Sequence, residues 1–262
     1  MARPPVIEDP SNRWLIHPIA EGLLPLAIRL GIAPNTVSFT GLAFGVASGF
    51  AYAQWRTPGM AVVGLLLMLG WHVCDGLDGK LARATGRTSP LGRLIDGLCD
   101  YLVFFAVLLP IALSLDDWRL LVLCIVAGGF HAVQSAWYEG EREAWRRRLL
   151  GLFAPVPRPV TRSMLERPYN WVEARLGSGL RPIDNALARR PALLPAYLEV
   201  SAPLVRAMAI AGANGRTFGI FIAVSAGVPW AYWLWEIFGV TALALGLATW
   251  LRRREAAIAA MA

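Results

Sequence analysis

Long apolar runs follow one another along most of the chain, separated by short polar connections. A helix needs roughly 17 to 25 apolar residues to cross a bilayer. The last two runs are so close that Pro229–Glu236 must form a tight turn between them, and its tryptophans suit the membrane interface. The pattern predicts an all-α integral membrane protein with about six transmembrane helices. The segments can be drawn near 36–54, 59–80, 91–115, 119–138, 217–233 and 235–251.

A different pattern precedes the first of these segments. Between residues 15 and 30 apolar side chains recur at helical spacing, while charged side chains and two prolines interrupt the stretch. This predicts an N-terminal interfacial amphipathic helix, which lies on the membrane without crossing it. The residues before it lack the features of a cleaved secretory signal. We therefore divide the chain into 1–33, a cytosolic N-terminus with this helix, and 34–262, a six-helix membrane domain. The apolar stripe consists of Leu15, Ile19, Leu23, Leu26 and Leu30.

Composition supports the membrane assignment and excludes an ordinary soluble domain. Of the residues, 56% are hydrophobic and 16% charged, and the mean hydropathy is +0.49. The net charge of +7 comes mostly from arginine and suits anionic lipids, nucleic acid or phosphorylated substrates alike. The three cysteines lie in apolar runs and are interpreted as reduced packing residues.

Basic residues gather in alternate connections, which predicts an orientation. Lys80, Arg83, Arg87 and Arg93 lie in one connection, many arginines in 139–216, and three more at the C-terminus. Because cytosolic loops are enriched in Lys and Arg, both termini should be cytosolic. In a bacterial cell the membrane would be the inner, cytoplasmic one.

The basic cytosolic connection, 139–216, is rich in Arg, Pro, Leu and Trp. Two pieces of it, 162–176 and 193–211, can form amphipathic helices on the membrane surface. We expect Arg146, Arg147 and Arg148 to help capture an acidic lipid. The alternative is a solvated basic loop that only obeys the positive-inside rule.

Four carboxylates mark the expected chemistry, because charged groups at helix depth in a membrane indicate function. Asp75 and Asp78 are spaced i, i+3, and Asp96 and Asp100 i, i+4, so each pair shares one helix face. A turn at 86–89, with Ser89 as N-cap before a first-turn proline, makes the two helices antiparallel neighbours. Oxygen ligands that converge in this way favour hard cations, so we predict two Mg²⁺ or Mn²⁺ ions.

The residues around the carboxylates suit phosphate binding. Gly79, Ala82 and Gly92 lie one helical turn from the aspartates and leave room for a large substrate. Arg83 offers a planar donor fork that matches a diphosphate.

The segment from Asp75 to Asp100 resembles the CDP-alcohol phosphotransferases. It matches the family pattern D-x2-D-G-x2-A-R-x8-G-x3-D-x3-D at every fixed position. The resemblance is good over about 34–138 and weakest in 139–216. It implies a metal-dependent, homodimeric membrane enzyme with a polar cavity facing the cytosol.

The resemblance also implies roles for the motif residues. Asp75 and Asp96 would bridge two metal ions, with Asp78 completing one site and Asp100 the other. Asp100 would also take the proton from the acceptor hydroxyl, which attacks the β-phosphorus of a CDP-linked donor and releases CMP. The nucleotide part would contact Asp78, Gly79, Ala82, Arg83 and Gly92.

The motif does not determine whether the donor or the acceptor carries the lipid. We expect CDP-diacylglycerol as donor and a small alcohol as acceptor; the alternative is a CDP-headgroup donor with a lipid alcohol. The partners are these substrates, membrane lipids and a second copy of the chain, with no nucleic acid. Polar residues near the inner end of the fourth span, His131, Gln134 and Tyr138, could line the acceptor pocket or simply form interhelical hydrogen bonds.

Three other interpretations compete with a metal-dependent phosphotransferase. Four membrane carboxylates could serve a cation- or proton-coupled transporter, although the chain shows no repeated halves. A non-catalytic lipid- or nucleotide-binding protein would tolerate loss of an aspartate, and none is lost. Zinc binding by His72, Cys74 and Cys99 is disfavoured because His72 and Cys74 point to different helix faces.

Overall fold

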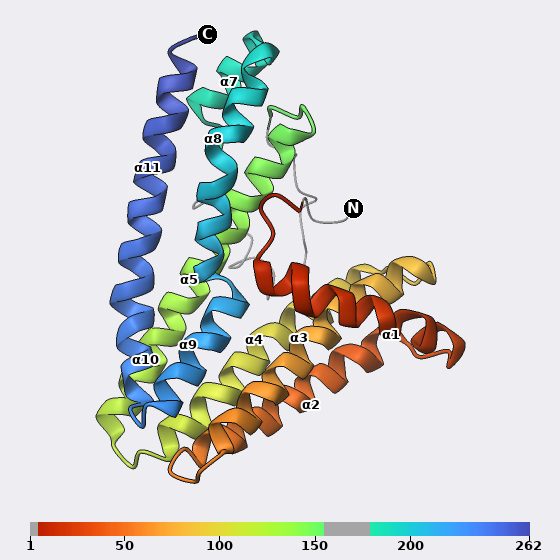
Figure 1. Cartoon of the computed structure of the whole chain (residues 1–262), viewed down its shortest axis with the longest axis vertical. Helices are drawn as coiled ribbons and strands as arrows, with labels where there is room; N and C mark the ends of the chain where they lie inside the picture. Colours follow the sequence, from red (N-terminus) through yellow and green to blue (C-terminus); the bar gives the residue numbers. More distant parts are fainter. Residues whose placement is uncertain (1–4, 155–178) are drawn as a thin grey trace. The chain divides into compact units, whose positions relative to one another are not determined.

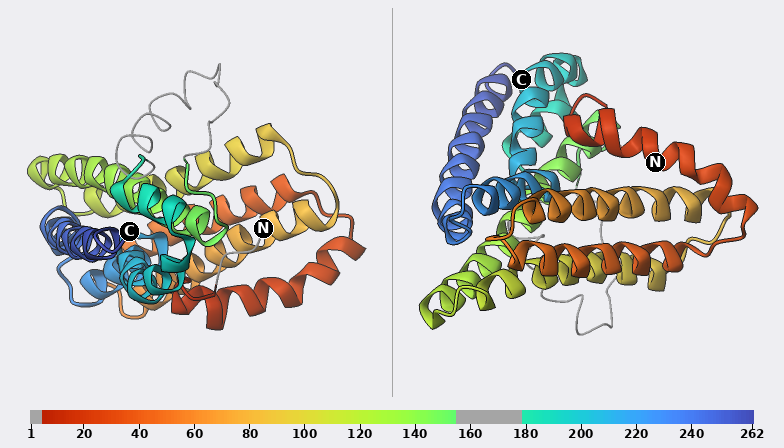
Figure 2. Two further views of the ribbon diagram at one scale, coloured as in Figure 1. Left: turned by 90° about the horizontal axis from the view of Figure 1, so that it is seen from above. Right: turned by 60° about the horizontal axis from the view of Figure 1, so that its bottom comes forward.

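The computed structural model describes residues 5–154 and 179–262, without the side chains of 90, 91, 93, 94, 96 and 97. The described residues form helices joined by short turns and no strands, which confirms the predicted all-α class. Figures 1 and 2 show the helices as long rods. They are η1 (Asn12–Ile16), α1 (His17–Arg29), α2 (Pro34–Ala53), α3 (Met60–Ala84), α4 (Pro90–Leu113), α5 (Trp118–Leu149), α7 (Pro182–Arg189), η2 (Pro191–Leu193), α8 (Leu194–Ala207), η3 (Met208–Ala211), α9 (Ala213–Ser225), α10 (Trp230–Leu234), η4 (Trp235–Val240) and α11 (Thr241–Ala259).

The chain divides into two compact units. We call Pro10–Gly128 with Arg216–Leu234 the motif unit, because it holds the four aspartates. The C-terminal unit consists of Met1–Asp9, Gly129–Gly215 and Trp235–Ala262. The long helix α5 begins in the first unit and ends in the second.

Close packing of α2 against α3 and α4 builds the motif unit (Figure 1). Glycines of α2 make this approach possible: a Cβ added at Gly45 would lie 2.6 Å from Val103, and one at Gly49 would collide with the carbonyl oxygen of Ala106. Ser48 is fully buried between them and donates to the carbonyl of Gly64 on α3 at 2.9 Å. Small residues and buried hydroxyls are what membrane helices use to approach closely.

Replacing Gly49 by alanine should therefore lower stability. The new methyl group meets a backbone oxygen that cannot move aside, and overpacking of this kind costs roughly 1–3 kcal/mol. The matched control is Gly128→Ala in α5, where an added Cβ meets nothing within 4 Å. Thermal unfolding in detergent should show a lower midpoint for Gly49→Ala alone; equal midpoints would show that the α2–α4 contact can relax.

The N-terminal helix α1 packs on α3 through small side chains. Ala20 and Ala27 are buried against Leu77 and Leu81, and Lys80 forms a 2.7 Å ion pair with Glu21. The hydrogen bond and charge of Lys80 hold the pKa of Glu21 below its usual value. The apolar stripe predicted for this segment stays exposed, as an interfacial helix requires: Leu15, Ile19, Leu23, Leu26 and Leu30.

In the described part of the chain, five helical segments are long and apolar enough to cross a membrane, and a further apolar helix, Leu98–Leu113, is shorter. This supports the integral membrane class. The first four predicted segments correspond to α2, α3, α4 and α5. The five are Pro34–Ala53, Met60–Ala84, Trp118–Leu149, Pro191–Ala211 and Trp230–Ala259.

The two predicted segments 217–233 and 235–251 were placed wrongly. Helix α9 already ends at Ser225, because Gly227 adopts a left-handed φ of +73° and the Val228 N–H bonds back to Ala223. The next helix then runs from Trp230 to Ala259, so Trp235 and Glu236 lie in a π-helical turn within it and not in a loop.

The connection 139–216 also differs from its prediction. The piece 193–211, expected on the membrane surface, belongs to an apolar segment long enough to cross the membrane. The piece 162–176 lies outside the described residues. The described residues of the rest are mostly helical and belong to the C-terminal unit, so this part is not a solvated loop.

Two of the three arginines that we expected to face lipid belong instead to a buried network of ion pairs. Arg147 and Arg148 are 5% and 1% exposed, and only Arg146 lies near the surface, beside Glu143. Asp184 on α7 accepts hydrogen bonds from both buried arginines. The expectation failed because neighbouring arginines near a helix end look alike in sequence whether they face lipid or the protein core. The network contains Glu141, Arg147, Arg148, Arg181, Asp184, Arg252 and Glu255.

Candidate active site

The turn between α3 and α4 has the predicted form. Helix α3 ends at Ala84, and Gly86 follows with a left-handed φ of +67°. Ser89 then caps α4, its hydroxyl accepting a hydrogen bond from the Gly92 N–H at 2.9 Å, with Pro90 in the first turn. These local rules reverse the chain, so that the two acidic helix ends share one end of the motif unit.

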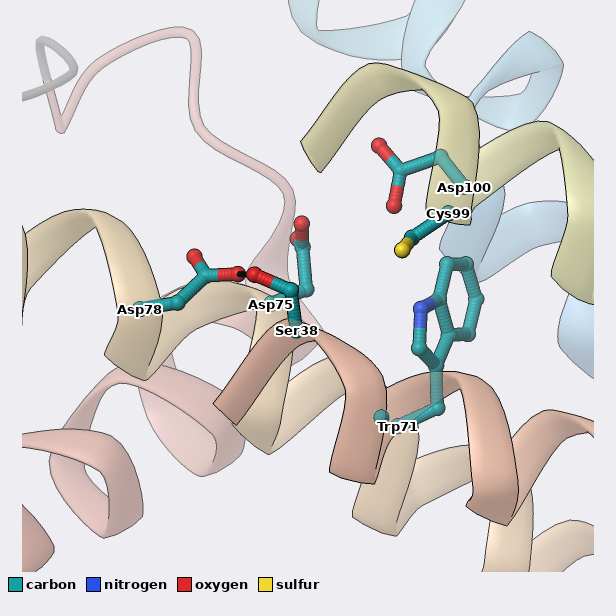
Figure 3. A pocket seen from close by; sticks show the side chains of 7 residues that line it. Ser38, Trp71, Asp75, Asp78, Cys99 and Asp100 are labelled. Atoms are coloured by element: carbon teal, nitrogen blue, oxygen red, sulfur yellow. Dashed lines mark hydrogen bonds between the residues drawn. The ribbon is translucent and has the colours of Figure 1, made fainter. Parts of the chain in front are cut away.

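A small pocket lies where α2, α3 and α4 meet (Figure 3). Three of the four predicted aspartates line it, and the carboxylates of Asp75 and Asp100 point into the space between their helices. Asp96 lies on α4, but its side chain is outside the described part of the structure. The lining residues are Ser38, Gly41, Trp71, Asp75, Asp78, Cys99 and Asp100.

The Asp78 carboxylate is turned toward α2. Its Oδ2 accepts a hydrogen bond of 2.6 Å from the Ser38 hydroxyl, and both residues are buried. Sequence reasoning missed Ser38 as a site residue. The available signal was a serine one turn inside a helix that begins Pro34-Asn35-Thr36, close to the predicted motif.

Aromatic side chains close the apolar side of the pocket. Trp71 is 3% exposed and packs edge-to-face on Phe104, with ring centroids 5.4 Å apart. Cys99 lies above the indole ring in Figure 3. An apolar wall limits water access and strengthens electrostatic interactions in a site of this kind.

The zinc hypothesis gains no support from His72. Its Nε2 lies 2.9 Å from the Thr217 hydroxyl, at hydrogen-bonding distance, in the interior of the motif unit. All three cysteines are free thiols and buried, as the packing interpretation predicts.

The donor set suits hard divalent cations. Asp75, Asp78 and Asp100 supply oxygen ligands to one pocket, and carboxylates are what Mg²⁺ and Mn²⁺ prefer. Among the described side chains no three His, Cys, Asp or Glu groups are close enough to form a metal cluster. The fit therefore rests on ligand chemistry and on convergence in one pocket.

The predicted nucleotide contacts lie next to the acidic residues. The guanidinium group of Arg83 folds over Gly79, so that a Cβ added there would be 3.2 Å from its Nη1. Ala82 is on the same helix, and Gly92 lies beside Ser89 and Asn35 at the start of α4. The absence of a side chain at Gly79 leaves room for the guanidinium group, whose planar set of N–H donors suits a phosphate ligand.

The predicted acceptor residues lie in the C-terminal unit and do not line this pocket. Gln134 donates to the Glu236 carbonyl at 2.9 Å and to the Thr241 hydroxyl at 3.0 Å. The Nδ1 atom of His131 is 3.9 Å from Glu236 Oε1, and Tyr138 packs in the core of the unit. The two contacts of Gln134 are interhelical hydrogen bonds of the kind given as the alternative. Glu236 was not predicted, because it was assigned to a turn.

Fold and pocket together show a helical protein with apolar helices of membrane-spanning length and a pocket lined by three aspartates. Residues 31–145 match the sequence model of the CDP-alcohol phosphatidyltransferases. The match extends over α2, α3, α4 and most of α5. The family depends in general on divalent metal ions.

Several curated proteins are similar to this region. Rat cholinephosphotransferase 1 is 34% identical over 125 residues, covering 42% of this chain and 30% of the relative. Archaetidylinositol phosphate synthase of Pyrococcus horikoshii is 32% identical over 98 residues, covering 37% and 50%. Phosphatidylinositol phosphate synthase of Mycobacterium marinum is 27% identical over 132 residues, covering 48% and 53%. The chain thus spans about a third to a half of these relatives, and no solved structure gives a significant match.

Proposed function

We propose that this protein transfers a substituted phosphate group from a CDP-linked donor to the hydroxyl of an acceptor alcohol and releases CMP. The observation that carries the proposal is the pocket of Asp75, Asp78 and Asp100, with Arg83 folded over Gly79 on the same helix. This arrangement lies inside the part of the chain that matches the family.

Each motif residue has a role in this reaction. Asp75, Asp78, Asp96 and Asp100 would hold two Mg²⁺ or Mn²⁺ ions, which would supply positive charge to the transferring phosphoryl oxygens. Arg83 binds the diphosphate through its fork of N–H donors, and Asp78, Gly79, Ala82 and Gly92 complete the nucleotide site.

Bond formation and cleavage occur at one phosphorus. The acceptor oxygen forms a bond to the β-phosphorus as the bond from that atom to the CMP oxygen breaks, and Asp100 takes the hydroxyl proton. His131, Gln134 and Tyr138 stay candidates for acceptor binding.

The donor in this proposal is CDP-diacylglycerol, with a small polar alcohol as acceptor. A CDP-headgroup donor with a lipid alcohol is the second candidate. The similar proteins include both a cholinephosphotransferase and a phosphatidylinositol phosphate synthase, so similarity does not favour one donor.

Purified protein with radiolabelled CDP-diacylglycerol or CDP-choline, each with a panel of alcohols, tests both. Thin-layer analysis should show one labelled lipid and stoichiometric CMP. Absence of CMP release with every donor would refute the enzymatic proposal.

The proposal places both termini and the pocket on the cytosolic side and pairs two copies of the chain. Six crossings satisfy this orientation if the helical path from Pro191 to Ser225, interrupted at Gly212, makes the fifth. Single cysteines at Thr57 and Gly227 should then label from one side, and a cysteine at Ala192 from the other. Labelling of Thr57 and Ala192 from the same side would show that the crossing count is wrong.

A further inference from the structure

The Ser38 hydroxyl, inside helix α2, donates a hydrogen bond to the Asp78 carboxylate on another helix. Helical serines commonly bond to the carbonyl four residues earlier. The Ser38 hydroxyl is 3.4 Å from that carbonyl, on Pro34, but 2.6 Å from Asp78 Oδ2, forty positions along the chain. A hydroxyl carries one proton, and a distance of 2.6 Å is typical of a charge-assisted O–H···O⁻ bond. The proton is therefore donated to the carboxylate.

This bond favours one orientation of the Asp78 carboxylate. The terminal torsion of an aspartate is broad, so a carboxylate without a fixed partner samples many orientations. Asp78 is 5% exposed and Ser38 is 7% exposed, so bulk water competes little for the bond. Helix α2 is packed closely against α4 at Gly45 and Gly49 and is hydrogen-bonded to α3 through Ser48, so Ser38 lies on a well-packed helix.

We propose that Ser38 is a positioning residue that presents the Asp78 carboxylate to the divalent cation. The inference rests on the proposed function, because it assumes that Asp78 is a metal ligand. Groups that hydrogen-bond to metal ligands orient them, and removal of such a group typically weakens metal binding 10- to 100-fold. Ser38 itself need not touch the metal or the substrate.

The chain provides a matched control in Ser48. It lies on the same helix, is fully buried and also donates one hydrogen bond to α3, but to the backbone carbonyl of Gly64. Removing either hydroxyl loses one buried interhelical hydrogen bond. Of these two hydroxyls, that of Ser38 contacts a carboxylate of the pocket and that of Ser48 does not.

The experiment titrates Mn²⁺ into the purified full-length protein in lipid nanodiscs and measures free Mn²⁺ by electron paramagnetic resonance. Ser38→Ala should raise the Mn²⁺ dissociation constant 10- to 100-fold, Ser38→Thr should restore it to within a fewfold, and Ser48→Ala should leave it unchanged. The Mg²⁺ concentration for half-maximal turnover should change in the same order. The midpoint of thermal unfolding shows how much each substitution lowers the stability of the protein.

Two results would overturn the inference. In one, Ser38→Ala binds Mn²⁺ as tightly as the unmodified protein and only lowers the thermal midpoint, as Ser48→Ala does. In the other, Ser38→Thr is folded but binds as weakly as Ser38→Ala. If Ser38→Ala weakens Mn²⁺ binding as expected but no CDP-linked donor yields CMP, the inference stands and the proposed function fails. A protein that binds no Mn²⁺ at all overturns both.

Discussion

Asp75→Asn should reduce CMP release by two to four orders of magnitude while leaving the protein folded. The side chain lines the pocket from α3 and points toward the α4 side, where Asp100 lies (Figure 3). Asparagine keeps the shape of the side chain but removes a negative charge that would balance the proposed metal ions. The loss of one preorganised electrostatic contact in a phosphoryl-transfer site typically costs 10²–10³ in rate, and a residue that bridges two metals should cost more.

The control for this variant is Asp116→Asn. Asp116 has a left-handed φ of 52° in the turn after α4, a conformation that asparagine tolerates well. The two substitutions make the same chemical change, but only Asp75 lies in the pocket. Steady-state CMP release and the thermal midpoint should be measured for both. A near-normal rate for Asp75→Asn would refute the assignment of the pocket as the active site.

Removal of divalent cations should reduce CMP release at least as strongly as Asp75→Asn does. Excess chelator should abolish CMP release, and Mg²⁺ or Mn²⁺ should restore it, because the pocket concentrates carboxylates that need compensating charge. Turnover that persists in chelator would leave no place for metal ions in the proposed chemistry.

The part of the site that could be predicted depends on local rules. The i, i+3 and i, i+4 spacings of the aspartates fix their helix faces, and the Gly86 and Ser89 positions fix the turn that brings the helices together. These signals lie within twenty-six residues and need no knowledge of the rest of the fold. Ser38 could not be predicted in this way, since its contact with Asp78 depends on how closely α2 approaches α3.

The C-terminal part of the fold was harder to predict, because composition identifies apolar helices but not where they break. Between residues 191 and 259 apolar residues are nearly continuous, and the turn at Gly227 is marked by one glycine and one proline. Trp235 and Glu236 resemble an interfacial turn in sequence, yet a π-helical turn carries them through without interruption. The buried arginines have no periodic signature at all.

These buried arginines carry the second large prediction: Arg148→Met should destabilise the protein by about 3–5 kcal/mol, the cost of leaving buried charges without their partner. Arg148 binds both oxygens of Asp184, at 2.7 and 3.0 Å, and also the Tyr197 hydroxyl and Glu255. Its guanidinium group therefore joins α5, α7, α8 and α11.

The control is Arg146→Met, two positions earlier on the same helix. Arg146 is partly exposed and pairs with Glu143, at 3.3 Å. Exposed pairs of this kind contribute roughly 0–1 kcal/mol. Thermal unfolding in detergent should show a large fall in midpoint for Arg148→Met and almost none for Arg146→Met. Similar small shifts in both variants would show that the buried network adds no net stability.

Acidification should weaken the same network through Asp184. Burial by itself raises the pKa of this carboxyl, but hydrogen bonds and charge from Arg148, the Arg181 N–H and Arg147 outweigh burial and hold the pKa below its usual value. A lowered pKa means that Asp184 contributes its full stability above the unfolded-state pKa of about 3.9 and loses it as the pH falls through the folded value. Asp184→Asn should therefore lower the midpoint at neutral pH and show a smaller further decrease below about pH 4 than the unmodified protein. Parallel pH profiles for the two proteins would show that Asp184 does not control the acid sensitivity of this unit.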